Sequence, residues 1–288
     1  MAERVWTCKD ALAWTTEYLG KKGDEHPRRS AEWLLSAATG LSRVELYAQH
    51  DRPLTPEERA RYREAVARRA EGMPLQYVTG EMPFRHLVIS VQPGVFIPRP
   101  ETEVLVDVVL GHIADLAAPT VIDLCTGSGC VAVAVASEHP GARVWATDRD
   151  ERAVEAARRN ALHAGVSERV QVVQGNLFDP LPDALVAGVD AIVSNPPYVP
   201  SGDLNGLPPE VVGFEPVAAL DGGADGLDVF RDILAGSSRW LGPGGVLAVE
   251  LDARHISDAA RLLERDYDGV ALHKDLTGRD RIVFGRKG

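Results

Sequence analysis

Apolar residues in the first part of the chain recur at helical spacing. One set comprises Ala11, Leu12, Thr15, Tyr18 and Leu19, and a second comprises Ala31, Leu34, Leu35 and Ala38. Positions three and four apart lie on one face of a helix, so each set predicts a helix with one buried side. A third helix is expected after Thr55, because Pro56 suits the first helical position and Glu58 completes a capping box. We therefore predict a helical domain over residues 1–75.

The pattern changes after residue 75. Residues 76–97 are rich in Val, Ile, Phe and Tyr and are interrupted by Gly80, Pro83 and Gly94. Alternating strand-forming residues between turn-forming residues are typical of a β-hairpin. We predict that 76–97 is a hairpin linker between two domains.

From residue 98 onward, short apolar runs alternate with helical stretches. The runs are 121–124, 144–146, 170–173, 191–193, 246–249 and 281–284. Continuous apolar strands separated by helices are typical of a parallel sheet covered on both faces. Residues 98–288 are therefore expected to form an α/β domain of the Rossmann-like kind.

Length and composition fit this division. A chain of 288 residues is long enough for two domains. No apolar run approaches the roughly 18 residues that cross a membrane, and residues 1–10 lack the apolar stretch of a secretory signal. The three cysteines are too few for a disulfide framework or a structural zinc site. We expect a cytoplasmic protein with reduced thiols and no metal.

The negative charge is unevenly distributed. Residues 1–80 hold 13 of the 31 Lys and Arg residues and 12 of the 42 Asp and Glu residues, a net charge of +1, so the remainder carries −12 and the whole chain −11. An acidic catalytic portion would repel a phosphate backbone. A protein partner is therefore favoured over direct binding of nucleic acid, and no membrane partner is expected.

A glycine-rich turn follows the first predicted strand of the α/β domain. The segment is Asp123-Leu124-Cys125-Thr126-Gly127-Ser128-Gly129, and a helix of small residues comes directly after it. Glycines allow a ligand to approach the backbone closely, and a helix N-terminus presents unpaired N–H groups. Asp148, at the end of the next strand, can accept hydrogen bonds from ribose hydroxyls. These features predict a nucleoside cofactor site, with NAD binding or a plain tight turn as alternatives.

A second motif, Asn195-Pro196-Pro197-Tyr198, follows the run 191–193. Ligands of open α/β sheets bind at the carboxyl ends of the strands. Two prolines remove two N–H donors, so this turn presents oxygens that accept hydrogen bonds. The Asn195 side-chain oxygen and the Pro196 carbonyl can accept both hydrogens of a planar NH₂ group, while Tyr198 packs on its flat face. An ordinary proline turn is the structural alternative.

Such a turn suits methyl transfer to nitrogen. The lone pair of an amide nitrogen is delocalised into the carbonyl, and holding both hydrogens out of plane localises it. Directed at a sulfonium methyl group, this lone pair can displace the thioether in one step, helped by positioning and by acceptors matched to the developing charge. We predict an S-adenosylmethionine-dependent methyltransferase that needs no metal and no general base.

The chain also resembles the PrmC/HemK family of peptide chain release factor glutamine methyltransferases. The likeness extends over residues 68–286 and includes the segments 74–80 and 97–103, the glycine turn, Asn195 to Tyr198, the segment 214–216 and the segment 278–281. The resemblance implies a helical substrate-recognition domain, a hairpin, and a seven-stranded methyltransferase domain whose last strand is antiparallel. It implies that the substrate is the glutamine of the Gly-Gly-Gln motif in class 1 release factors.

The resemblance also assigns residues. It implies cofactor contacts from Asp123, Cys125, Thr126, Gly127, Ser128, Gly129, Asp148, Asn176, Leu177 and Asn195, with Leu177 beside the adenine. It implies that Asn195, Pro196, Pro197 and Tyr198 hold the glutamine, and that Asn195, Pro196 and Tyr198 carry the catalysis. The chain departs from the usual family residues at Cys125, Asn176, Leu177, Asp252 and His255, which leaves details of the adenine pocket open.

Other functions remain possible at this point. A ribosomal-protein glutamine methyltransferase shares the layout, and adenine-N6 DNA methyltransferases share the Asn-Pro-Pro-Tyr turn. The acidic catalytic portion and the lack of an evident DNA recognition domain disfavour DNA. An inactive binding module is disfavoured by the presence of Asn195 and Asp148. The segment 201–226 is long and rich in Gly and Pro, so it is either a substrate lid or a surface loop.

Overall fold

The computed structural model describes residues 5–288. The chain folds into two compact units. Residues 1–4 lie outside the described residues. They belong to the segment 1–10, for which the sequence predicts no secretory signal. The first unit comprises residues up to Glu81 together with Pro208–Phe214, and the second comprises Met82–Leu207 and Glu215–Gly288. In the part of the chain that the structure describes, no helix is both long and apolar enough to cross a membrane.

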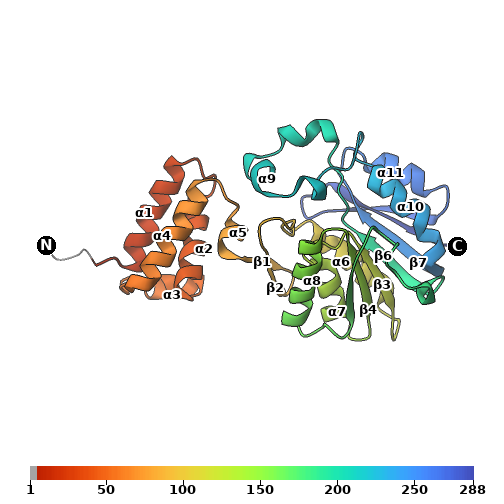
Figure 1. Ribbon diagram of the computed structural model, residues 1–288, viewed down its shortest axis with the longest axis horizontal. Coiled ribbons are helices and arrows are strands. Elements are labelled where there is room, and N and C mark those ends of the chain that lie inside the picture. The colour runs from red at the N-terminus through yellow and green to blue at the C-terminus, as the bar shows by residue number, and fades with distance from the viewer. Residues whose placement is uncertain (1–4) are drawn as a thin grey trace. The chain divides into compact units, whose positions relative to one another are not determined.

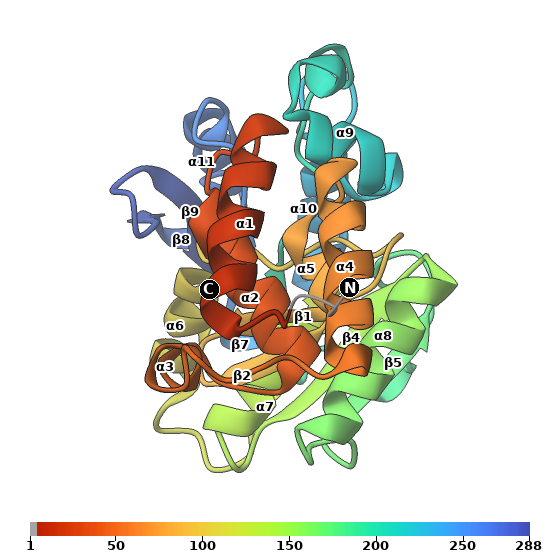
Figure 2. The same ribbon diagram turned by 90° about the vertical axis from the view of Figure 1, so that its left-hand side faces the viewer.

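The first unit, here called the helical unit, is built from α1 to α5 and α9. Their bounds are α1 Cys8–Lys21, α2 Pro27–Thr39, α3 Arg43–Ala48, α4 Pro56–Ala70, α5 Leu75–Thr79 and α9 Pro209–Phe214. Helices α1, α2 and α4 lie against one another (Figure 2) and bury the apolar face that the periodicity predicts. The capping box at Thr55 and Glu58 is present. The short helix α3 was not expected, and it also begins with a capping box.

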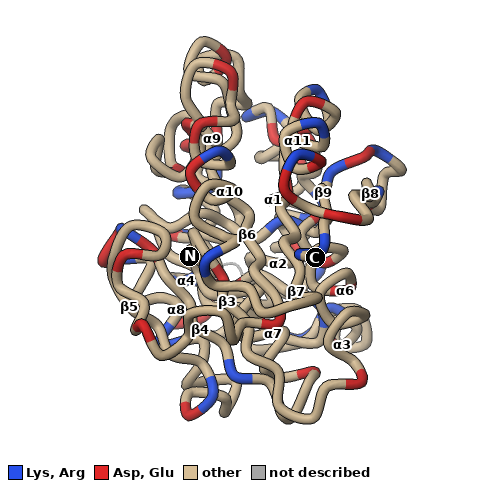
Figure 3. Tube along the Cα trace, turned by 90° about the vertical axis from the view of Figure 1, so that its right-hand side faces the viewer, with Lys and Arg blue, Asp and Glu red and all other residues tan. Residues whose placement is uncertain are grey.

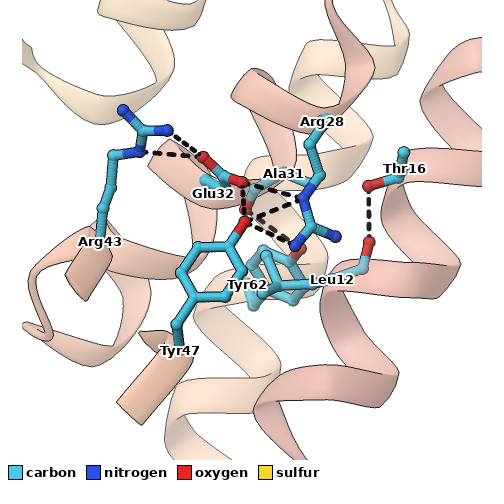
Figure 4. A network of polar contacts seen from close by, with 8 residues as sticks. All are labelled: Leu12, Thr16, Arg28, Ala31, Glu32, Arg43, Tyr47 and Tyr62. Carbon is cyan, nitrogen blue, oxygen red and sulfur yellow. Dashed lines mark hydrogen bonds and ion pairs between the residues drawn. The ribbon is translucent and has the colours of Figure 1, made fainter. Parts of the chain in front are cut away.

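A buried carboxylate joins α2 to α3. Glu32 on α2 accepts hydrogen bonds from Arg28, Arg43 and the Tyr47 hydroxyl, as Figure 4 shows. Burial would raise the pKa of Glu32, but these hydrogen bonds hold it below its usual value. Because the charge is paired, α3 is fastened to α2 without an unsatisfied buried ion.

The expected hairpin over 76–97 is wrong in its extent. The strands are β1 Glu81–Phe84 and β2 Leu87–Ser90, and residues 75–79 form the helix α5 instead of a strand. Gly80 ends α5 in the left-handed conformation, with its N–H donating to the Gln76 carbonyl. A five-residue stretch is too short to show a distinguishing periodicity, so the sequence does not separate strand from helix here.

The second unit, here called the sheet unit, contains a seven-stranded sheet in the order β5-β4-β3-β6-β7-β9-β8. The strands are β3 Thr120–Leu124, β4 Arg143–Asp148, β5 Val170–Gln174, β6 Val189–Ser194, β7 Leu241–Glu250, β8 Asp268–Lys274 and β9 Asp280–Arg286. Strands β3 to β7 are parallel, and β9 is antiparallel to both of its neighbours. Strand β8 was not predicted, because most of its side chains are exposed and it has no continuous apolar run.

Helices cover both faces of this sheet (Figure 1). Helices α6 Thr102–Ile113, α7 Cys130–Glu138 and α8 Glu151–His163 pack on one face, and α10 Asp228–Trp240 and α11 Ile256–Leu263 pack on the other. The expected Rossmann-like α/β fold is confirmed. The carboxyl ends of β3, β4 and β6 therefore meet at one edge of the sheet, where both predicted motifs lie.

Candidate active site

The glycine turn joins β3 to α7 in a conformation that needs small residues. Cys125, Gly127 and Gly129 all have positive φ, at 57°, 55° and 79°. A Cβ atom on Gly129 would lie 2.8 Å from the Cβ of Ala157, so only glycine fits there. A Cβ atom on Gly127 would meet nothing within 4 Å, so the backbone of the turn is open to a ligand.

The side chains of Asp123 and Thr126 stabilise this turn by hydrogen bonding. The Thr126 hydroxyl donates to the Asp123 carboxylate over 2.5 Å, and the N–H of Ala132 donates to the same oxygen over 3.2 Å. Burial raises the pKa of Asp123 to about 7. Asp123, Thr126 and Ser128 are all buried, so they shape the turn more than they expose groups to a ligand.

Asp148 lies at the end of β4, directly opposite the turn. One of its oxygens accepts from the Gly127 N–H over 2.9 Å, and the other accepts from the Asp150 N–H over 3.0 Å. A carboxylate has about four lone-pair positions, so both oxygens can still accept from a ribose diol. Burial raises the pKa of Asp148 above its ordinary value. The hydrogen bond between Asp148 and Gly127 was not predicted from the sequence. Through it Asp148 also stabilises the glycine turn.

Asn176 and Leu177 follow β5 at the same edge of the sheet. Leu177 has a positive φ of 46°, and its carbonyl accepts from the Thr147 hydroxyl over 2.9 Å. Its side chain packs against the core, whereas Asn176 is exposed. The hydrogen bond to Thr147 fixes the backbone here although the residues depart from the usual family pair.

The Asn195-Pro196-Pro197-Tyr198 turn leaves the end of β6, beside β3. The register pairs Leu124 with Ser194, and the Ser194 hydroxyl donates to the Leu124 carbonyl over 2.7 Å. Asn195 and Cys125 therefore follow adjacent strands, whose backbones are separated by about 5 Å in a sheet. The glycine turn and the proline turn lie side by side.

Asn195 is oriented by a residue that the sequence did not identify as functional. Its Nδ2 donates to the hydroxyl of Thr102 over 3.1 Å, which leaves Oδ1 available as an acceptor. Tyr198 is half-buried, and burial raises the pKa of its hydroxyl, so it stays neutral. The prolines contribute no N–H donors to the turn.

Part of the segment 201–226 supports the proline turn directly. A Cβ atom on Gly222 would lie 2.7 Å from the Pro197 carbonyl, and one on Gly226 would lie 2.3 Å from the Tyr198 carbonyl. These glycines are required because the two stretches of backbone touch. Residues 208–214, in contrast, belong to the helical unit, where Glu210 pairs with Arg69 over 3.0 Å. Whether the segment acts as a lid stays a prediction.

The segment 97–103, which carries much of the family likeness, is anchored by Glu215. The Glu215 carboxylate accepts from Arg99 over 2.5 Å and from the Ile97 N–H over 3.4 Å. The Arg99 guanidinium also lies over the ring of Phe96, 4.7 Å from its centre. The Glu215 side chain is 1% exposed, so this charge is buried and paired.

Cys125 is expected to be a source of strain rather than a nucleophile. Burial raises the pKa of its thiol to about 12, so it is not a thiolate near neutral pH. A side chain with left-handed φ is strained, so Cys125→Gly should raise the free energy of unfolding by about 1 kcal/mol, with cofactor affinity preserved. Urea denaturation and calorimetry measure the two quantities. Cys130→Gly, within α7, should instead destabilise the protein, and equal losses for both variants would contradict this account.

Comparisons with known proteins agree with this arrangement. Residues 10–80 match the family model described as the PrmC N-terminal domain, and residues 86–205 match the one described as methyltransferase small domain. The release factor glutamine methyltransferase of Geobacter sulfurreducens is 46% identical over 99% of this chain and 98% of its own. The protein of the same name from Gloeobacter violaceus is 44% identical over 88% of this chain and 88% of its own. That from Streptomyces coelicolor is 39% identical over 96% of this chain and 96% of its own.

Solved structures extend the likeness to the fold. A methyltransferase from Pyrococcus furiosus aligns with a TM-score of 0.50 and 21% identity over 71% of this chain and 90% of its own. The hMettl16 catalytic domain, solved in complex with an MAT2A 3′UTR hairpin, aligns with a TM-score of 0.53 and 17% identity over 78% and 82%. At these identities the similarity concerns the fold alone.

Proposed function

The chain belongs to the family of release factor glutamine methyltransferases, and from this premise we propose that it methylates the side-chain amide of the glutamine in the Gly-Gly-Gln motif of class 1 release factors. The methyl donor is S-adenosylmethionine. The observation that carries the proposal is the adjacency of the two turns after β3 and β6, one suited to a nucleoside and the other to a planar amide.

The residues at the sheet edge fit the cofactor. The open face of Gly127 admits a ligand to the backbone, and Asp148 retains acceptor positions for the ribose hydroxyls. Asp123, Thr126, Ser128 and Gly129 shape this turn, while Cys125, Asn176 and Leu177 complete its surroundings. When bound, S-adenosylmethionine supplies an electrophilic methyl group on a positively charged sulfur.

Asn195 and the proline turn orient the acceptor nitrogen. Asn195 Oδ1 and the Pro196 carbonyl accept the two amide hydrogens, and Pro197 and Tyr198 confine the flat face of the amide. With S-adenosylmethionine bound, the nitrogen lone pair would form the new N–C bond as the S–C bond breaks and its electron pair leaves with the sulfur. The methylated nitrogen then loses one proton to water. Catalysis therefore rests on positioning and on acceptors placed for developing charge.

Transfer assays with three separate acceptors test the proposed substrate. The protein is incubated with methyl-labelled S-adenosylmethionine and a class 1 release factor, a ribosomal protein fraction or DNA. We expect label on the release factor glutamine alone, located by mass spectrometry of the peptide. Acidic and basic positions are interspersed along the trace in the view of Figure 3, and the net charge of −11 disfavours a phosphate backbone as the partner. Label on DNA or on ribosomal protein alone would contradict the proposal.

The helical unit is proposed to recognise the folded release factor. A glutamine in a flexible loop offers few contacts, so selecting it requires binding surface elsewhere. The helical unit exposes large apolar side chains, among them Trp14 at 48% and Val44 at 78%. Single exposed apolar residues need no partner, but aromatic groups of this kind are common at interfaces. Cytoplasmic action, where translation factors occur, is part of the same proposal.

Trp14→Ser combined with Val44→Glu should reduce the preference for intact factor. We expect kcat/KM for the factor to fall about fivefold or more, because an interface residue that matters contributes more than about 1 kcal/mol. The kcat/KM for a short Gly-Gly-Gln peptide should not change. Substitution is preferable to removing residues before Met73, since α9 belongs to the helical unit through contacts such as Arg69 to Glu210.

The matched control is Leu162→Glu, which changes an exposed apolar residue on α8 of the other unit. It should leave the ratio of factor to peptide unchanged. If the double variant discriminates between factor and peptide as well as the unaltered protein does, these side chains take no part in recognition.

A further inference from the structure

The proposed mechanism requires the Asn195 amide to be held one way round. Its Oδ1 must face the acceptor nitrogen, yet an amide that rotates by half a turn would present Nδ2 instead. In the structure Nδ2 donates to the Thr102 hydroxyl over 3.1 Å. Thr102 is the first residue of α6 and is 1% exposed. Water therefore does not compete for this hydrogen bond.

Thr102 alone does not fix the direction of that hydrogen bond. A hydroxyl has one hydrogen and two acceptor positions, so it could equally donate to Asn195. Glu250 removes this freedom. It is the last residue of β7 and is 1% exposed, and its carboxylate lies close enough to Thr102 for the hydroxyl to favour the ionised form. Burial raises the pKa of Glu250 to about 7, and once ionised its carboxylate can only accept, so the Thr102 hydrogen is directed to Glu250 and the Thr102 oxygen receives the Asn195 N–H.

The sheet register brings these residues together. Ser194 pairs with Val249 across β6 and β7, so Asn195 and Glu250 are the next residues along two adjacent strands. Helix α6, which carries Thr102, packs on both of these strands. The three side chains thus come from three elements that the fold places at one point.

We propose that Thr102 and Glu250 are positioning residues that keep Asn195 Oδ1 directed at the amide to be methylated. The inference rests on the proposed function, because it assigns a role to Asn195 in that reaction. It also gives a role to the family-specific segment 97–103. Glu215 anchors that segment through Arg99 and the Ile97 N–H, and so fixes the start of α6.

The surroundings of Glu250 are unfavourable for a residue with a purely structural role. Among the described residues, its Oε2 has no hydrogen-bond partner and is buried. Arg281 on β9 is a nearby positive charge, while Glu101 and Asp275 are nearby negative charges. A buried carboxylate with an unsatisfied oxygen destabilises a fold, and such groups are concentrated at functional sites.

The test compares Thr102→Val, Thr102→Ser, Glu250→Met and the Thr102→Val and Glu250→Met double variant with the unaltered protein. Steady-state kinetics with release factor give kcat and KM, calorimetry gives the Kd of S-adenosylmethionine, and melting curves give Tm. We expect kcat to fall about 10- to 100-fold in Thr102→Val and in Glu250→Met, with the cofactor Kd unchanged. Thr102→Ser, which keeps the hydroxyl, should retain nearly normal kcat.

Two further results separate positioning from stability. Glu250→Met should leave Tm unchanged or raise it while kcat falls, since a buried charge is replaced by an apolar side chain of similar size. The double variant should be no slower than the slower single variant, because both substitutions break one chain of hydrogen bonds. The control Ser237→Ala removes a buried hydroxyl bonded to Tyr267, and it should lower Tm without changing kcat.

The inference is overturned if Thr102→Val keeps kcat within about twofold of normal, if Thr102→Ser is as slow as Thr102→Val, or if the two losses multiply in the double variant. A failure of the proposed function would look different. In that case the unaltered protein itself would not methylate the release factor.

Discussion

Asn195→Ala is expected to lower kcat for release factor methylation by roughly 1,000-fold, the scale seen when a preorganised group at a reacting centre is removed. The Asn195 side chain supplies one of the two acceptors that orient the amide hydrogens. Without it, the nitrogen lone pair remains delocalised and is no longer aimed at the methyl group. The effect appears in single-turnover assays with saturating cofactor and factor.

Cofactor binding should survive this substitution. The glycine turn is held by Asp123, Thr126 and Asp148, none of which contacts the Asn195 side chain through a described hydrogen bond. Calorimetry should therefore give a Kd for S-adenosylmethionine close to the normal value. Asn205→Ala changes an exposed asparagine in the 3-10 helix Ser201–Gly206 that follows the turn; it is the control and should have normal kcat. Near-normal turnover by Asn195→Ala would refute the assigned mechanism.

Asp148→Ala is expected to weaken S-adenosylmethionine binding by about 1–3 kcal/mol, the cost of leaving a ribose diol unpaired. This corresponds to an increase in Kd of roughly 5- to 150-fold. The loss should lie toward the upper end, because the Asp148 carboxylate also accepts from the Gly127 N–H and so holds the turn. Calorimetry measures Kd directly, and kcat at saturating cofactor should change much less than Kd.

Cofactor affinity should also depend on pH through Asp148. Burial raises the pKa of this carboxyl, so its ionised, acceptor-only form is fully present only above that raised value. Affinity should then fall as the pH is lowered through it, and Asp148→Asn should show a weaker dependence over the same range. Unchanged affinity in Asp148→Ala would remove this residue from the cofactor site.

The candidate site could be predicted from the sequence as far as each motif is local. The glycine turn, the acidic residue after the next strand and the Asn-Pro-Pro-Tyr turn each lie within a few residues of a strand end. Parallel strands end at one edge of a sheet, so placing these motifs together required only the fold class. The side chains that orient them were not found, because Thr102, Glu215 and Glu250 belong to no motif with a known chemical role.

The bounds of the helices and strands also separate what local sequence patterns predict from what they do not. Helices α1, α2 and α4 and the buried strands were predicted because helical and strand periods are properties of neighbouring residues. The hairpin was misplaced and β8 was missed where short or exposed stretches carry too little periodicity. Helix α9 belongs to the helical unit although it lies far along the chain. Its place there comes from contacts between residues distant in sequence, such as Arg69 and Glu210, which no local pattern predicts.

The sequence alone thus determined the α/β class, the helical N-terminal region and the two turns that bear the chemistry, since these depend on local spacing and backbone restriction. Only the tertiary structure decided which way the Asn195 amide points. That direction depends on Thr102, 93 residues away, and on the register that sets Glu250 beside Asn195. A hydrogen bond forms only between atoms about 3 Å apart, and for residues this distant in sequence such proximity comes from packing.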